Sequence, residues 1–285
     1  VDECTEILSE ALKAGINFID TAQMYLTYKP IRRAMEATGI RPIIATKSAA
    51  STYEDMQKAV DDALTQLNLD TIDIFLIHAA RTDESVFSQR AEAIRCLLDY
   101  KARGIIKAVG ISTHSVRSVR ASAHNKDLDI VFPILNLNGL GILHGTREEM
   151  KDAIKSCIDK GKGVYIMKAL SGGTLIDSYR QALDYVRSIP GVASIAMGMV
   201  SVQELLYNIR YFNGELDDAD AINTAQARKR FIVVKALCTN CGNCRDTCPN
   251  EAITESEGVS VIHESKCLTC GYCVSSCGEF AIRMV

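Results

Sequence analysis

Short apolar strands and amphipathic helical segments alternate along residues 1–213, and this alternation restricts the fold more than any other feature of the chain. The repeat is roughly 30 residues long, which is typical of successive strand–helix units. It predicts an α/β protein with a parallel sheet, because each helix returns the chain to the start of the next strand. Strands are predicted at residues 16–20, 42–47, 72–78, 106–112, 130–136, 164–168 and 192–197, and the clearest helices at 54–67, 90–103, 147–160 and 202–211.

The same joint closes three of the helical segments. Gly15, Gly104 and Gly161 each follow a cation in the last helical turn and stand shortly before a strand. Glycine there favours the left-handed backbone that ends a helix, and the cation complements the helix dipole. Seven such units, preceded by a helix, predict a (β/α)8 TIM barrel whose first strand lies upstream of Val1. A doubly wound open sheet is the alternative, but its glycine-rich dinucleotide-binding turn is absent from the sequence.

Eight of the 11 cysteines fall in the last 48 residues, in two motifs of one spacing. In each motif three cysteines are separated by two residues, and a fourth follows after three more. This spacing lets three thiolates surround one iron–sulfur cubane while the fourth cysteine reaches the other cluster. It predicts two [4Fe-4S] clusters, one bound by Cys238, Cys241, Cys244 and Cys277 and the other by Cys267, Cys270, Cys273 and Cys248.

A pair of zinc sites is the alternative for these cysteines, but zinc sites usually show two close pairs with a longer gap between them. Gly242 and Gly271 follow the second cysteine of each motif, where they let backbone amides approach cluster sulfurs. The segment resembles bacterial two-cluster ferredoxins, which implies a small C-terminal α+β ferredoxin-like domain. Gly278 stands where the second motif of that family usually has proline, a change in a turn and not in a ligand.

These features divide the chain into three parts. Residues 1–213 form the predicted barrel, residues 214–230 a polar linker rich in Asp and Ala, and residues 231–285 the two-cluster domain. Cys4, Cys96 and Cys157 lie in helical segments, where isolated cysteines usually act as small apolar side chains.

Composition excludes several classes of partner. The net charge is −3 and no basic stripe is present, so a nucleic-acid partner is not expected. The apolar runs are far shorter than the roughly 20 residues of a membrane helix, which predicts a soluble protein without membrane insertion. Cysteines spaced as metal ligands, with no signal peptide, favour the reducing cytoplasm.

Three predicted strands end in a polar residue that the preceding apolar run does not explain. Asp20, Lys47 and His78 occupy these positions, and Tyr25 follows in the loop after Asp20. Taken singly, each has an ordinary role: a helix cap, a solvated strand end, a rim histidine and a core tyrosine. In a barrel, however, all four would lie at the carboxyl-end face, where active sites are built.

Together, Asp20, Tyr25, Lys47 and His78 resemble the catalytic tetrad of the aldo-keto reductase family. The resemblance covers residues 16–208 and is closest around Asp20-Thr-Ala-x-x-Tyr25 and Ala45-Thr-Lys47. It implies an oxidoreductase that uses a nicotinamide to reduce a small carbonyl compound, or to oxidise the alcohol.

The chemistry of carbonyl reduction requires these residue types. A phenol with a pKa of about 10 is a poor acid at neutral pH. A buried Lys47 ammonium is expected to lower the pKa of Tyr25, with Asp20 holding the ammonium charged and oriented. His78 would donate a hydrogen bond to the carbonyl oxygen, and Tyr25 would act as base in the oxidative direction.

The resemblance also implies residues that contact the nicotinamide cofactor, at the ends of later strands. Ser112 matches the serine that holds the carboxamide, although the usual following asparagine is Thr113. Glu204 stands where members using NADPH carry a cation, and its carboxylate would repel a 2′-phosphate, which favours NADH over NADPH. The implied contacts are Ser112, Leu170, Gly172, Gly173, Gly198, Ser201, Glu204 and Asn208.

Nicotinamide transfers two electrons as hydride, whereas each cluster transfers one, so three functions remain open. The clusters could pass electrons between the reductase and a redox partner protein, or they could be structural or redox-sensing. Alternatively, the chain is an electron carrier whose barrel is a non-catalytic docking module. The sequence does not identify the substrate beyond a small carbonyl or alcohol.

Overall fold

The computed structural model describes residues 2–216, 230–279 and 281–284. In them, seven parallel strands form one sheet whose order in space follows the order in the sequence. A doubly wound sheet would reverse its order at a switch point, so the consecutive order confirms the predicted barrel class. The strands are β1 (Phe18–Asp20), β2 (Ile43–Ser48), β3 (Ile72–His78), β4 (Ile106–Thr113), β5 (Ile130–Pro133), β6 (Gly163–Met167) and β7 (Ser194–Ala196).

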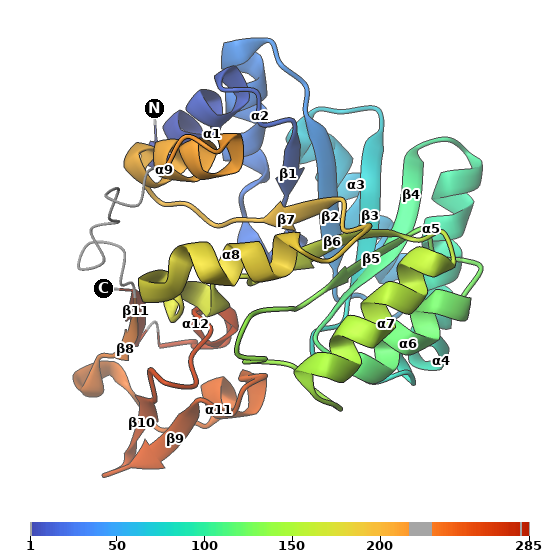
Figure 1. Cartoon of the computed structure of the whole chain (residues 1–285). Coiled ribbons are helices and arrows are strands. Elements are labelled where there is room, and N and C mark those ends of the chain that lie inside the picture. Colours follow the sequence, from blue (N-terminus) through green and yellow to red (C-terminus); the bar gives the residue numbers. More distant parts are fainter. Residues whose placement is uncertain (1, 217–229, 280, 285) are drawn as a thin grey trace.

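Helices cover the outside of this curved sheet (Figure 1). The three predicted joints are confirmed, because Gly15, Gly104 and Gly161 have φ angles of 91°, 74° and 79°. The helices are α1 (Glu3–Lys13), α2 (Tyr28–Thr38), α3 (Tyr53–Leu67), α4 (Val86–Gln89), α5 (Ala91–Ala102), α6 (Val116–His124), α7 (Arg147–Asp159), α8 (Tyr179–Arg187) and α9 (Val202–Asn213), with single 3-10 turns η1 (Gln23–Tyr25), η2 (Ser171–Gly173) and η3 (Ile176–Ser178).

The barrel is nearly closed. β1 and β7 are the outer strands, and the described residues contain no pairing between them. Aromatic side chains bring the first and later strands together, since the rings of Phe18 in β1 and Tyr165 in β6 lie 5.0 Å apart. The strand predicted upstream of Val1 remains a prediction.

Three strands are shorter than predicted. β1 begins at Phe18 instead of residue 16, β5 ends at Pro133 instead of residue 136, and β7 covers Ser194–Ala196 instead of residues 192–197. Asn136 lies in a turn. Its side-chain oxygen accepts from the N–H of Leu140, and its side-chain NH2 donates to the carbonyl of Leu140, both at 2.9 Å. An asparagine side chain that bonds to nearby backbone in this way competes with strand pairing.

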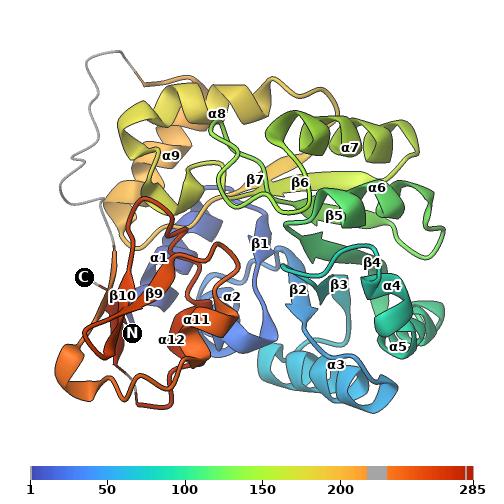
Figure 2. The same cartoon turned by 90° about the horizontal axis from the view of Figure 1, so that it is seen from below.

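The C-terminal module begins at β8 and contains two small antiparallel sheets, β8 with β11 and β9 with β10. It lies at one end of the barrel, where the carboxyl ends of the strands meet (Figures 1 and 2). Residues 217–229, which make up most of the predicted linker, lie outside the described residues. The elements are β8 (Phe231–Val233), η4 (Lys235–Leu237), α11 (Asn243–Thr247), β9 (Ile253–Ser256), β10 (Val259–Ile262), α12 (Tyr272–Ser275) and β11 (Ile282–Met284).

Among the described residues, no helix is both long enough and apolar enough to cross a membrane.

A buried carboxylate at the opposite end of the barrel ties three strands together. Asp73 in β3 accepts hydrogen bonds from the N–H of Ile44 at 2.9 Å, from Lys107 Nζ at 2.7 Å and from Arg41. Burial alone would raise the pKa of Asp73, but these three donors together lower it below its ordinary value. The carboxylate is therefore stabilised in its charged form by folding.

Asp73→Asn is expected to lower the free energy of unfolding by about 1–3 kcal/mol, because hydrogen bonds to a charged group are worth more than neutral ones. Asp73 stabilises the fold above its unfolded-state pKa of about 3.9, and this contribution is lost as the pH falls through the lower folded-state pKa. The difference in unfolding free energy between wild type and variant should be constant near neutral pH and should disappear in acid. Urea unfolding across this range tests it, with Asp70→Asn, an exposed position, as the control; a pH-independent gap would contradict the assignment.

Candidate active site and cluster cavities

The four tetrad residues predicted from the sequence meet at the carboxyl ends of the first three strands. Asp20 ends β1, Lys47 lies near the end of β2 and His78 ends β3, while Tyr25 closes the turn η1 directly after β1. Lys47 Nζ lies 5.2 Å from the centre of the Tyr25 ring, and the rings of Tyr25 and His78 are 6.0 Å apart. The site is assembled by parallel strand register, because equivalent strand ends lie side by side.

Lys47 and Asp20 form a buried ion pair beneath the site. Lys47 Nζ donates to Asp20 Oδ2 at 2.5 Å and to the carbonyl of Thr21 at 2.7 Å. The other carboxylate oxygen accepts from the Tyr165 hydroxyl at 2.8 Å. Burial raises the pKa of Asp20 and lowers the pKa of Lys47, and the charge of each opposes the shift of the other. These three bonds fix the direction in which Lys47 points.

The expected lowering of the Tyr25 pKa is not found in this arrangement. The pKa of Tyr25 lies well above its ordinary value, first because burial penalises the phenolate and then because Asp20 and Cys270 add negative charge nearby. A hydrogen bond with Tyr272 acts in the other direction but is weaker.

His78 is a neutral imidazole at physiological pH. Burial, followed by the nearby charges of Lys47 and His114, lowers its pKa to about 3. The side chain is almost completely buried, and the carbonyl of the same residue accepts a hydrogen bond from Arg90 at 2.9 Å. A neutral ring carries one proton, so His78 can donate a hydrogen bond to an oxygen beside Nε2 only in the tautomer that is protonated on Nε2.

A residue from the C-terminal module enters the tetrad. The hydroxyl of Tyr272 lies 2.7 Å from His78 Nε2 and also forms a hydrogen bond with Tyr25. The rings of Tyr272 and His78 are 5.6 Å apart. The sequence prediction missed this residue, and the available signal was an aromatic side chain placed directly before a cysteine ligand, in Gly271-Tyr272-Cys273.

Lys168 is a second residue whose position the sequence did not indicate. It follows β6 with a φ angle of 60°, an unusual backbone conformation for a side chain of this size. Burial lowers its pKa, whereas the nearby Cys270 and Cys267 raise it. The Lys168 amine therefore interacts electrostatically both with the second cysteine motif and with Lys47 of the tetrad.

The residues implied to hold the pyrophosphate of the nicotinamide cofactor are partly covered. Gly172 has a φ angle of 68°, and a Cβ atom there would lie 2.0 Å from the carbonyl oxygen of Leu268. The Thr269 hydroxyl donates to the Gly172 carbonyl at 2.6 Å. Gly173, by contrast, faces open space. The backbone does approach closely at Gly172, but what it meets is the C-terminal module.

The residues implied to hold the remaining parts of the cofactor have defined local roles. Ser201 caps α9 by accepting from the N–H of Glu204 at 3.1 Å, while the Glu204 carboxylate accepts from the N–H of Val200 at 2.9 Å. Asn208 accepts from Tyr179 at 2.7 Å. Of the other three, Ser112 is buried and pairs in register with His78, Leu170 directly precedes the turn η2, and Gly198 is exposed with open space around it.

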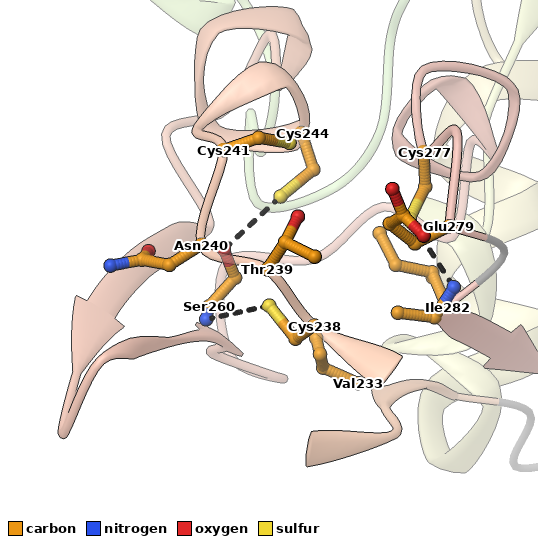
Figure 3. A pocket seen from close by; sticks show the side chains of 11 residues that line it. Val233, Cys238, Thr239, Asn240, Cys241, Cys244, Ser260, Cys277, Glu279 and Ile282 are labelled. Carbon is orange, nitrogen blue, oxygen red and sulfur yellow. Dashed lines mark hydrogen bonds between the residues drawn. The ribbon is translucent and has the colours of Figure 1, made fainter. Parts of the chain in front are cut away.

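The eight predicted cluster ligands surround two separate cavities in the predicted grouping. The first is drawn in Figure 3. The fourth cysteine of each motif lines the cavity of the other motif. The first cavity is lined by Cys238, Cys241, Cys244 and Cys277, and the second by Cys248, Cys267, Cys270 and Cys273.

The surroundings of these cavities fit iron–sulfur clusters. Backbone N–H groups point at ligand sulfurs at matching positions, from Ala252 to Cys248 and from Ala281 to Cys277, both at 3.3 Å. Such bonds favour the thiolate form that a cluster requires. In the part of the chain that the structure describes, no three His, Cys, Asp or Glu side chains are placed to hold a single metal ion. The four cysteines that line each cavity match the ligand set of a [4Fe-4S] cluster.

Comparison with known proteins finds two family models that match different parts of the chain. Residues 2–188 match the model of the aldo/keto reductase family, and residues 230–278 match a 4Fe-4S dicluster domain. An uncharacterized oxidoreductase from Bacillus subtilis, YqkF, is 22% identical over 283 residues, covering 82% of this chain and 90% of that protein.

Further relatives agree in fold. The methylglyoxal reductase DkgA of Yersinia pestis is 24% identical over 174 residues, which cover 58% of this chain and 62% of that protein. The solved aldo-keto reductase AKR11C1 from Bacillus halodurans superposes with a TM-score of 0.63 at 19% identity, covering 79% of this chain and 86% of that one. The family model covers well over half of the sequence, so the chain belongs to the aldo/keto reductase family of oxidoreductases and carries a 4Fe-4S dicluster domain at its C-terminal end.

Proposed function

We propose that this chain catalyses the nicotinamide-dependent reduction of a small carbonyl compound, or the reverse oxidation of its alcohol. The observation that carries the proposal is the convergence of Asp20, Tyr25, Lys47 and His78 at one end of the barrel, with Lys47 Nζ 2.5 Å from Asp20. The phenol of Tyr25, the ammonium of Lys47 and the imidazole of His78 together form a site that stabilises a carbonyl oxygen as it gains negative charge.

Each residue of the tetrad has a distinct part in this reaction. A bound nicotinamide would supply the hydride that the carbonyl carbon accepts. Tyr25 gives its hydroxyl proton to the carbonyl oxygen, and His78 Nε2 donates a hydrogen bond to that oxygen. Lys47 stabilises the phenolate that remains on Tyr25 until solvent returns the proton, and Asp20 orients Lys47.

Three of the residues implied to contact the nicotinamide cofactor support its use, whereas a fourth is covered in this structure. Gly173 and Gly198 leave room for a ligand, and Ser112 lies beside His78. The Gly172 backbone, however, is covered by Leu268. We keep the preference for NADH, because the carboxylate of Glu204 would repel the 2′-phosphate of NADPH.

The eight cysteines would hold two [4Fe-4S] clusters, which carry single electrons and favour a reducing compartment such as the cytoplasm. The second cavity shares Tyr272 with the tetrad. This contact favours a functional link between the second cluster and the barrel. A redox partner protein would then exchange electrons with the first cluster.

The proposal is tested with anaerobically purified full-length protein and a panel of small aldehydes, ketones and alcohols. Oxidation of NADH and NADPH is followed together with bleaching of the clusters and the EPR signal of their reduced state. Consumption of NADH with at least one carbonyl is the expected result. Absence of turnover with every compound, combined with rapid cluster reduction by a one-electron donor, would instead support the electron carrier with a docking barrel.

A further inference from the structure

The position of the Tyr272 hydroxyl coincides with the place that a substrate oxygen would need. A carbonyl oxygen in this site has to lie within hydrogen-bond distance of both Tyr25 and His78. The Tyr272 hydroxyl meets this condition, because it lies 2.7 Å from His78 Nε2 and is hydrogen-bonded to Tyr25. Two oxygen atoms cannot occupy one such position, so Tyr272 and a carbonyl substrate exclude each other.

The segment that carries Tyr272 is fixed to the barrel at several points. Thr269 donates to the carbonyl of Gly172, and Leu268 is buried with its own carbonyl packed against the same glycine. Leu268 also contacts the loop after β5, where a Cβ atom at Gly141 would lie 2.3 Å from its side chain. The segment thus covers the cofactor loop after β6 as well as the oxygen position.

A further bond holds the first cysteine motif to the same face. Arg81, in the loop after β3, donates to the backbone carbonyl of Asp246 in α11. The module therefore rests on the loops that follow β3, β5 and β6. These are the loops that form the active-site rim of a barrel.

We propose that residues 268–273 act as a gate on the active site, with Tyr272 filling the oxygen position until the segment withdraws. The assignment of that position to a carbonyl oxygen rests on the proposed function; the closure of the site does not. Tyr272 lies between Cys270 and Cys273, which line the second cavity. Withdrawal of Tyr272 therefore moves the loop that holds the second cluster, and access to the tetrad is coupled to that cluster.

The closure is tested by the reactivity of His78 toward diethyl pyrocarbonate, which carbethoxylates accessible imidazoles. Full-length cluster-loaded protein is treated anaerobically, and modification is quantified by peptide mass spectrometry. Tyr272→Ala should increase the rate at His78 at least about ten-fold, since the ring that covers the imidazole and both of its hydrogen bonds are lost. Tyr272→Phe, which loses only the hydroxyl, should give a smaller increase.

Two controls make the result specific. The rate at His124, which is exposed and distant in sequence, serves as the internal reference and should not change. Thr254→Val removes a hydroxyl of the same module that bonds only within it, to His263 at 2.8 Å, and should behave as wild type. Cluster absorbance confirms that each variant is loaded. Equal His78 rates in wild type and Tyr272→Ala would overturn the gate.

Hydrogen exchange with bound dinucleotide tests the movement itself. Saturating NADH should increase amide exchange in residues 267–273 of the wild-type protein, and Tyr272→Ala should bind NADH several-fold more tightly. Binding of NADH with exchange unchanged would overturn the gate. If neither protein binds NADH or NADPH, the proposed cofactor is wrong, and the His78 rates still decide whether Tyr272 closes the site.

Discussion

Tyr25→Phe is expected to lower kcat for carbonyl reduction by about 10²–10⁴-fold, the usual contribution of a positioned proton donor. The phenyl ring keeps the shape of the side chain but has no proton to give to the oxygen. Binding of NADH should not weaken, because the hydroxyl acts on the substrate, and it should tighten at most slightly, because only one of the two bonds that hold Tyr272 is lost. Steady-state kinetics with the best carbonyl, together with an NADH titration, measures both quantities.

The matched control is Tyr53→Phe, which removes an exposed hydroxyl that bonds to Asp99 at 2.9 Å on the outer surface of the barrel. It should leave kcat unchanged. Lys47→Met should reproduce most of the loss at Tyr25, since the two residues act as one unit and their effects should not add. A Tyr25→Phe enzyme that retains wild-type kcat would show that the tetrad is not the site of the chemistry.

The fourth cysteine of each motif, Cys248 or Cys277, lines the cavity of the other motif, and its loss is expected to remove one cluster and leave the other. Cys277→Ala should empty the first cavity, which Cys277 shares with Cys238, and should lower iron and acid-labile sulfide by about half. Cys248→Ala should do the same to the second cavity. Total iron alone does not tell which cluster is lost, so the grouping requires double variants.

Two double variants separate the groupings. Cys277→Ala combined with Cys238→Ala should lose no more iron than Cys277→Ala alone, because both residues line one cavity. Cys277→Ala combined with Cys267→Ala should lose nearly all iron, because the two residues line different cavities. The reverse pattern would show that each motif binds its cluster alone. Cys4→Ser, outside the module, is the control and should keep the full iron content.

Much of the molecule could be predicted from short-range patterns. The apolar runs located all seven strands of the described sheet, and the polar residues that end three of them marked the tetrad. Strand register then brings equivalent ends together without further information, as in the pairing of Asp20 with Ala45. The grouping of the cysteines was also predictable, because the short spacers of each motif limit which sulfurs can meet.

Other parts of the site were not predictable from these patterns. The pKa of Tyr25 is raised by burial and then by Asp20 and Cys270, and Cys270 and Tyr272 beside it belong to the C-terminal module. The family resemblance placed Gly172 beside a pyrophosphate, whereas in the structure the backbone of Leu268 occupies that space. Glu204 is also bound locally, to the N–H of Val200 at the start of α9.

The sequence by itself determined the barrel class, and it predicted which polar residues meet at the strand ends and which cysteines share a cavity, because each is encoded by spacing within a strand, a helix or a motif. Only the tertiary structure decided that Tyr272 meets His78, a residue 194 positions earlier in the chain. That contact depends on how two separately folded surfaces fit together, through points such as Thr269 with Gly172. Complementarity between distant surfaces leaves no periodic pattern in a sequence, whereas the local geometry of strands, helices and metal ligands does.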